Sequence, residues 1–156
     1  MQNLSAKSRH ISWPHIVAAL AGIAVSAYAV QVHHIVAAGG QSACGISATV
    51  NCDAVIGSKF GVILGLPLGI WGMVYFALMV LTAINDSKIS LRKAALIRLG
   101  LTTTGFVAVL GLAYISYIVI GVTCPVCMTI HGIITLIFIY SLFETWRICR
   151  KSTLEH

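Results

Sequence analysis

Four long apolar runs constrain this chain more than any other feature of its sequence. They cover residues 14–36, 62–84, 94–122 and 124–146, and about 20 apolar residues are enough for a helix to cross a bilayer. Backbone amides in lipid must be hydrogen-bonded within their own segment, so each run is expected to be helical. Charged residues make up 9% of the chain, against roughly 25% in soluble domains. The sequence therefore predicts an all-α membrane protein, a bundle of four transmembrane helices.

Lysine and arginine are distributed unevenly about these runs, which predicts the orientation of the bundle. A four-span arrangement puts nine of the ten basic residues on one side and only Lys59 on the other. The nine are Lys7, Arg9, Lys88, Arg92, Lys93, Arg98, Arg147, Arg150 and Lys151. Both termini are thus expected to be cytoplasmic, with the first and third connections outside. The net charge of +6 is attributed to these topology signals and to anionic lipid, rather than to nucleic-acid binding.

The chain is expected to divide into three parts. Residues 1–13 form a cytoplasmic N-terminal segment, residues 14–146 the membrane domain, and residues 147–156 a basic tail whose final Leu-Glu-His resembles a tag remnant. The first run is longer than the apolar core of a secretory signal, so it is expected to be a retained helix. We expect no buried Asp, Glu, Lys or Arg within a span, which argues against an ion pump or a proton-coupled transporter.

The first connection, residues 37–61, is long enough to form a structured outer cap. Asn51 or Asp53 is expected to begin a short helix there, with Val55, Ile56 and Phe60 on its apolar face. Glycines then recur every fourth residue into the second run. They are expected to share one face and to allow close helix packing; they are Gly57, Gly61, Gly65 and Gly69.

Four cysteines border the apolar runs on the predicted outer side. Cys124 and Cys127 form a Cys-x-x-Cys motif, a spacing that lets two thiols close to a disulfide. Pro125 suits the first position of a helix. Cys127 would then lie in the first turn, where free amides and the helix dipole favour a thiolate. Cys127 is therefore predicted to face an electron acceptor, and Cys124 to exchange with another disulfide.

Cys44 and Cys52 flank a short loop in the cap that could bring them together. A disulfide there is expected to be exposed and open to an incoming thiolate. Two alternatives stay open, namely structural disulfides in an oxidising compartment and a four-thiolate zinc site. Cys149 follows the fourth run on the reducing side and is expected to be a bystander.

Together, these cysteines, Ser58 and the four runs resemble the vitamin K epoxide reductase family over residues 14–146. The resemblance implies a bacterial or archaeal homologue. No fused thioredoxin-like domain is expected, because the chain ends soon after the fourth run. The resemblance implies a four-helix bundle around a quinone, under an outer cap. It also implies a membrane thiol:quinone oxidoreductase that supports disulfide-bond formation, in a bacterial or archaeal cell membrane with its active cysteines on the periplasmic or extracellular side.

The resemblance assigns a role to each site residue. Cys44 would exchange with the thiols of a separate thioredoxin-like or DsbA-like protein. Cys52 would pass electrons to Cys124 through a mixed disulfide, and Cys127 would reduce the quinone. Ser58 matches the family's serine or threonine that holds the cap near the site. Neither a metal nor a flavin is expected, because a dithiol supplies two electrons and a quinone accepts two.

Two departures from the vertebrate enzymes bear on the substrate. His131 stands where those enzymes carry a tyrosine, and Leu68 aligns with their asparagine. Plain reduction of ubiquinone or menaquinone is therefore expected, rather than epoxide reduction. The predicted quinone pocket is lined by Ile56, Trp71, Tyr75, Ile120 and His131. For His131, a bond or a proton to the quinone and a bond to a neighbouring helix both stay open.

Overall fold

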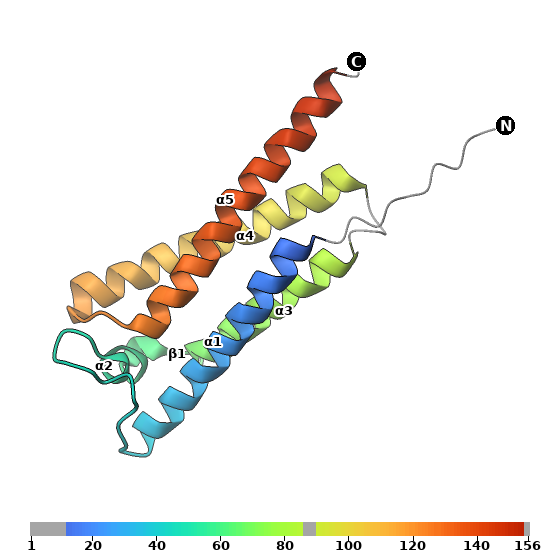
Figure 1. The fold of residues 1–156 in the computed structure, drawn as a ribbon. Helices are drawn as coiled ribbons and strands as arrows, with labels where there is room; N and C mark the ends of the chain where they lie inside the picture. The colour runs from blue at the N-terminus through green and yellow to red at the C-terminus, as the bar shows by residue number, and fades with distance from the viewer. Residues whose placement is uncertain (1–11, 86–89, 155–156) are drawn as a thin grey trace.

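The protein is a bundle of long helices capped at one end by a compact loop region (Figure 1). The computed structural model describes residues 12–85 and 90–154. The long helices are α1 (Trp13–Ala37), α3 (Leu68–Ile84), α4 (Leu91–Tyr114) and α5 (Pro125–Leu154), and α4 continues into the π-helical segment η3 (Ile115–Ile120). The cap contains the short helix α2 (Cys52–Ile56), the 3-10 turn η1 (Lys59–Gly61) and the strands β1 (Val62–Ile63) and β2 (Leu66–Pro67). Predictions that rest on Lys7, Arg9, Lys88, Glu155 and His156 lie outside the described residues.

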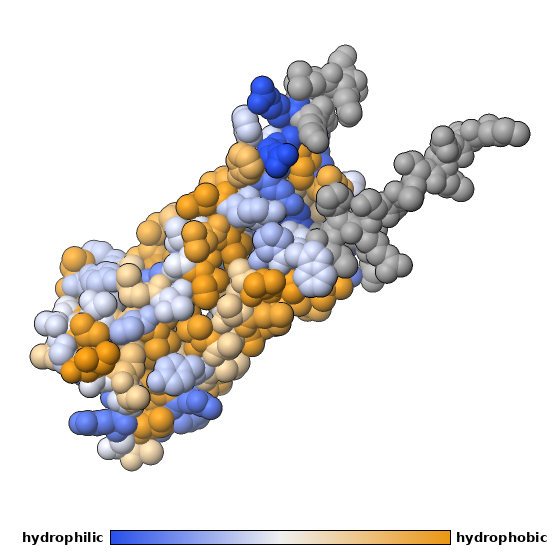
Figure 2. Space-filling model, in the orientation of Figure 1, coloured by the Kyte–Doolittle hydropathy of each residue, from blue (hydrophilic) through white to orange (hydrophobic). Residues whose placement is uncertain are grey.

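Three of these helices are long and apolar enough to cross a membrane: Trp13–Ala37, Leu91–Ile120 and Pro125–Arg150. Large apolar side chains point outward from the bundle, and Val107, Ile118 and Leu136 are each more than 60% exposed. Figure 2 shows a broad hydrophobic surface along the body of the bundle, with polar residues gathered toward its ends. Such a surface suits lipid rather than water, so the prediction of an all-α membrane protein is confirmed.

The second predicted span begins later than expected. Residues 62–67 form a small antiparallel hairpin, in which Val62 pairs with Pro67 and Ile63 with Leu66. Gly65 turns the chain with a positive φ of 78°, a conformation that glycine adopts without strain. Helix α3 therefore starts at Leu68 and has 17 residues. Hydropathy alone does not separate an apolar hairpin from a helix.

The expectation of a glycine face on one helix is wrong for the same reason. Gly57 ends α2, Gly61 lies in η1 and Gly65 lies in the hairpin turn, so only Gly69 belongs to α3. Gly69 does serve close packing. A Cβ at this position would lie 2.7 Å from the Ser26 backbone oxygen of α1, so α1 and α3 are in backbone contact there.

A charged pair is buried between α4 and α5. Arg98 is 2% exposed, and its guanidinium lies 2.9 Å from a carboxylate oxygen of Glu144. The expectation of no buried charge within a span is therefore wrong. By its place near the end of a run, Arg98 is predicted to be a topology signal. Glu144 is 46 residues away in the sequence, and only the packing of α4 against α5 brings the two together. Pairing is what makes such burial tolerable in a membrane.

The two ends of the bundle differ in character. The start of α1 and the end of α5 both lie at the end opposite the cap, and α5 projects beyond the other helices there (Figure 1). Helix α5 continues beyond the predicted end of the fourth span to Leu154. At the cap end, α4 and η3 join α5 through residues 121–124 alone, and Gly121 has a φ of 74°. Helices α4 and α5 are therefore joined by a tight connection.

Candidate redox site

The cap helix places the first cysteine pair. Asn51 caps α2, because its side-chain oxygen accepts a hydrogen bond from the Ala54 amide at 3.1 Å. This confirms the short helix expected to begin at Asn51. Cys52 is the first residue of α2 and is fully buried, while Ile56 at its other end packs into the same cluster. The N-cap thus directs Cys52 toward the bundle.

Asp53 holds the chain that leads into Cys44. Its carboxylate accepts a hydrogen bond from the Ser42 amide at 2.9 Å and another from the Ser42 hydroxyl. The Ser42 oxygen in turn accepts from the Cys44 amide at 3.2 Å. From the sequence, Asp53 is predicted only as an alternative N-cap of the short helix. Asp53 directly follows Cys52 in α2, so its bonds to Ser42 hold the segment before Cys44 against the helix that carries Cys52.

Cys44 and Cys52 form a disulfide with their Cα atoms 5.3 Å apart, within the usual range for such a bond. The expectation that this disulfide is exposed is wrong, since Cys44 is 8% exposed and Cys52 is 0% exposed. The loop between the two cysteines is hydrogen-bonded to the connection that precedes α5. The Asn51 amide donates to the Thr123 oxygen at 3.0 Å, and the Thr123 amide donates to the Thr49 oxygen at 2.9 Å.

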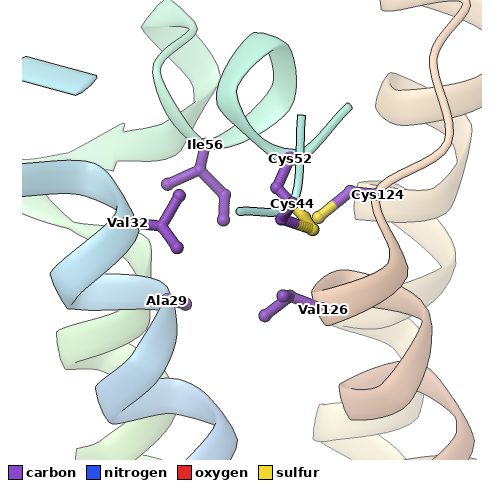
Figure 3. Packing of buried hydrophobic residues seen from close by; sticks show 7 residues of the cluster. All are labelled: Ala29, Val32, Cys44, Cys52, Ile56, Cys124 and Val126. Atoms are coloured by element: carbon purple, nitrogen blue, oxygen red, sulfur yellow. A yellow bond between two sulfur atoms is a disulfide. The ribbon is translucent and has the colours of Figure 1, made fainter. Parts of the chain in front are cut away.

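This contact brings the second cysteine pair beneath the first. Figure 3 shows the Cys124 sulfur pointing toward the Cys44–Cys52 disulfide. Cys124 is 1% exposed and shares a buried cluster with both cap cysteines, and Cys127 packs against that cluster. Four cysteines that are far apart in the sequence therefore occupy one site. The cap pair is oxidised, and Cys124 and Cys127 are both thiols.

The start of α5 distinguishes the two thiols. Pro125 is the first helical residue, as expected, and Cys127 lies in the first turn. The Cys127 amide donates a hydrogen bond to the Cys124 sulfur at 3.2 Å. A bond of this kind stabilises the charged form of its acceptor. It favours the thiolate at Cys124, whereas the sequence predicted the thiolate at Cys127.

The Ser58 side chain makes its hydrogen bonds within the cap. Its hydroxyl donates to the Val55 oxygen at 2.7 Å and accepts from the Phe60 amide at 3.2 Å. Ser58 therefore joins α2 to η1 and fixes the corner of the cap. Its implied role in holding the cap stays a prediction.

A cavity of about 510 Å³ lies beneath the cap, between α1, α3, α4 and α5. Its lining is overwhelmingly apolar, and its volume falls within the roughly 300–1,000 Å³ usual for ligand sites. The Cys127 side chain is part of that lining. All five residues predicted for a quinone pocket also line it: Ile56, Trp71, Tyr75, Ile120 and His131. The lining suits a flat apolar ring next to the Cys127 sulfur.

Hydrogen bonds fix two of the aromatic side chains. The Trp71 indole donates to the Ile63 oxygen of the hairpin at 3.2 Å. The Tyr75 hydroxyl donates to the Leu101 oxygen of α4 at 3.2 Å. The Trp71 N–H and the Tyr75 O–H are therefore hydrogen-bonded to backbone oxygens of the protein rather than directed at a ligand. In the described part of the chain, no hydrogen bond joins the His131 ring to a neighbouring helix.

One polar residue of the cavity, His33, was not predicted from the sequence. This residue lies near the end of α1, its ring lines the cavity, and its Nδ1 lies 3.2 Å from the Ile56 oxygen. A histidine at the outer end of the first apolar run was the available signal.

Cys149 is 22 residues beyond Cys127 on α5, so the two lie about 33 Å apart along the helix axis.

The described residues contain no group of three or more His, Cys, Asp or Glu side chains placed to hold a metal ion. The arrangement can instead perform thiol–disulfide exchange, because a thiol that favours its charged form points at a buried disulfide. A second thiol, Cys127, then connects that exchange to an apolar cavity.

Comparison with known proteins agrees with this arrangement. The sequence model of the vitamin K epoxide reductase family matches residues 13–142. The match covers the cap, all four site cysteines and the helices that enclose the cavity. A membrane oxidoreductase follows from this membership and from the cysteine site. The chain belongs to the vitamin K epoxide reductase family.

Proposed function

We propose that this protein is a membrane thiol:quinone oxidoreductase that supports disulfide-bond formation. One observation carries the proposal. Cys124 points at the Cys44–Cys52 disulfide, while Cys127, its partner in the Cys-x-x-Cys motif, lines the apolar cavity. The four sulfurs thus form a continuous path from the cap to a site that suits a quinone ring.

The path accounts for both electrons. The Cys44–Cys52 disulfide receives them from the thiols of a partner protein and becomes a dithiol. The Cys52 thiolate then attacks Cys124 in an oxidised Cys124–Cys127 pair, and the Cys127 sulfur leaves. Cys44 closes the cap disulfide by displacing Cys124. The redox state described above, with the cap pair oxidised and the inner pair reduced, is the product of this transfer.

The inner pair then gives its electrons to a quinone held against Cys127. Ile56, Trp71, Tyr75, Ile120 and His131 would hold the ring. A membrane quinone supplies a two-electron acceptor there, and ubiquinone and menaquinone are the expected forms. Apolar Leu68 also lines the cavity, which favours plain quinone reduction over epoxide chemistry because it offers no hydrogen bond to a substrate oxygen.

The electron donor is proposed to be a separate thioredoxin-like, DsbA-like protein on the outer side. Burial of the cap disulfide means that the donor needs the cap to open, or needs Cys44 to swing outward. The protein would work in a bacterial or archaeal cell membrane. Helix α3 acts as the fourth span in this proposal, with both termini cytoplasmic.

The test is quinone reduction by purified protein in detergent. A reduced thioredoxin-like protein serves as donor, and loss of quinone absorbance is followed for the wild type and for Cys127→Ala. Thiol-dependent turnover is expected in the wild type only. Retained turnover in Cys127→Ala would contradict the role of Cys127.

Cys149→Ala is the matched control, because it removes a thiol from the same helix far from the site. It is expected to keep full activity. No turnover in the wild type, with a folded protein and an active donor, would favour structural disulfides or a four-cysteine metal site. Zinc-dependent protection of the thiols would then separate these two alternatives.

A further inference from the structure

We propose that His33 is a catalytic residue that delivers one of the two protons needed for quinone reduction. The inference rests on the proposed function and deepens it. Quinol formation takes two electrons and two protons. The electrons come from Cys124 and Cys127, but the hydrogen bond from the Cys127 amide favours Cys124 as a thiolate. The inner pair then carries only one proton, and the second must come from another group.

Few side chains of the cavity have a proton to give. The Tyr75 hydroxyl donates to Leu101, and the Ser116 hydroxyl donates to the Val122 oxygen at 2.7 Å. The Ser26 hydroxyl is buried with no hydrogen-bond partner among the described residues, but an alcohol is too weak an acid to give its proton to a quinone oxygen. Besides Cys127, the lining leaves two histidines, His33 and His131.

Hydrogen bonding determines the state of the His33 ring. The Ile56 carbonyl can only accept, so Nδ1 of His33 must carry a hydrogen and donate it over 3.2 Å. The other ring nitrogen, Nε2, is then the atom that gains and loses a proton. This bond also ties α1 to α2, the helix that carries Cys52. The ring is therefore oriented by the same cap that positions the cysteines.

His33 and Cys127 line the same cavity at a similar depth in the bundle. His33 lies four residues before the end of α1, and Cys127 lies two residues after the start of α5. Both are thus within about 6 Å of the cap ends of their helices. Val32 and Ile56, its neighbours in sequence and space, belong to the cluster against which Cys127 packs.

Access to water separates His33 from His131. His131 follows Cys127 by one helical turn and lies deeper in the bundle. His33 lies directly beneath the cap, whose other side faces the outer aqueous phase in the proposed topology. A proton lost from Nε2 of His33 can therefore be replaced from outside. Histidine is suited to this exchange, because its charge changes near neutral pH.

The reaction balances with His33 included. The Cys124 thiolate and the Cys127 thiol form a sulfur–sulfur bond and lose two electrons. The thiol proton of Cys127 and the Nε2 proton of protonated His33 go to the two quinone oxygens. The products are a disulfide, a quinol and neutral His33, so charge and hydrogen are conserved. Water on the cap side then restores the proton.

His33→Asn tests this role, with His34→Asn as its matched control. An asparagine amide has the reach of Nδ1 and can still donate to Ile56, but it cannot carry the proton. The neighbouring His34 is exposed and is not part of the cavity lining. For His33→Asn we expect kcat to fall about 100-fold, as for loss of a general acid, while KM for a short-chain ubiquinone stays close to the wild-type value. His34→Asn should match the wild type.

The pH profile gives a second measurement. Only protonated His33 donates, so wild-type kcat should decline as pH rises. That decline should be absent from His33→Asn, and added imidazole should restore turnover in His33→Gly. The profile must separate the influence of other titratable or charged groups. Tyr75, Cys127 and His131 line the same cavity, His34 is the neighbouring ring, and Asp53 and Lys59 belong to the cap elements α2 and η1.

A third measurement needs no quinone. Nitrogen NMR of histidine-labelled protein should show neutral His33 with its hydrogen on Nδ1; a hydrogen on Nε2 in the neutral ring would overturn the inference. Wild-type kcat and an unchanged pH profile in His33→Asn would also overturn it and would identify His131 as the donor. Failure of the wild type to reduce quinone would instead reject the proposed function itself, and the inference with it.

Discussion

Cys124 is the residue at which the two halves of the site meet. Its sulfur points at the cap disulfide, and its charge is favoured by the amide of Cys127. Attack on a disulfide needs a thiolate, and a good leaving sulfur is also one that tolerates negative charge. Cys124 meets both needs at once, so electrons can pass through it in either direction between cap and membrane.

The Cys127→Ala variant should trap this exchange. Without Cys127, a mixed disulfide between Cys52 and Cys124 cannot be resolved from the membrane side. We expect acid quenching, alkylation and peptide mapping to recover the Cys52–Cys124 link, with Cys44 alkylated. Cys124→Ala, which removes the attacking sulfur, is the control and should yield only the Cys44–Cys52 link. Recovery of that link alone in Cys127→Ala would exclude Cys124 as the relay.

At the scale of elements, the close approach of α1 and α3 forms one wall of the cavity. Two glycines of α3 allow it, since a Cβ at Gly69 or at Gly72 would lie 2.7 Å from an atom of Ser26. At Gly69 the obstructing atom is a backbone oxygen, which cannot rotate away. Small residues at such contacts are the usual means of bringing membrane helices together.

Gly69→Ala should therefore separate α1 from α3. We expect a loss of about 1–3 kcal/mol, the usual cost of overpacking, together with weaker quinone binding because both helices line the cavity. Thermal unfolding in detergent and quenching of Trp71 fluorescence by quinone would measure the two effects. Gly132→Ala on α5 is the matched control, because a Cβ there meets nothing within 4 Å. Equal stability of the two variants would contradict a backbone contact at Gly69.

At the scale of the whole molecule, an apolar surface separates two unlike ends (Figure 2). The cap end holds the disulfide, and the opposite end holds the start of α1 and the last turns of α5, with Arg147 and Arg150. The Arg98–Glu144 pair joins α4 to α5 in the half of the bundle away from the cap. A buried pair of this kind is costly to break from one side only, so it favours one arrangement of these two helices.

This arrangement predicts which residues can be labelled from each side of the membrane. Ala48 is exposed in the cap loop, so Ala48→Cys should react with a membrane-impermeant maleimide in intact cells. Cys149 lies in α5 toward its far end and should react only after the cells are permeabilised. Ala48→Cys combined with Cys149→Ala is the control that assigns each signal. Labelling of Cys149 in intact cells would reverse the proposed orientation.

The sequence by itself determined the class of the protein and the composition of its site. Apolar runs predict membrane helices because lipid leaves the backbone no other partner. The spacing of the four cysteines, with the resemblance it carries, was enough to name the cysteines and five of the residues that line the cavity. Tertiary structure alone decided the burial of the cap disulfide, the thiolate preference of Cys124, the start of α3 and the pairing of Arg98 with Glu144. The burial of the disulfide and the Arg98–Glu144 pair depend on contacts between segments far apart in the chain, such as Asn51 with Thr123. The bond to the Cys124 sulfur and the hairpin before α3 are local, but they depend on backbone geometry that hydrophobic periodicity does not encode.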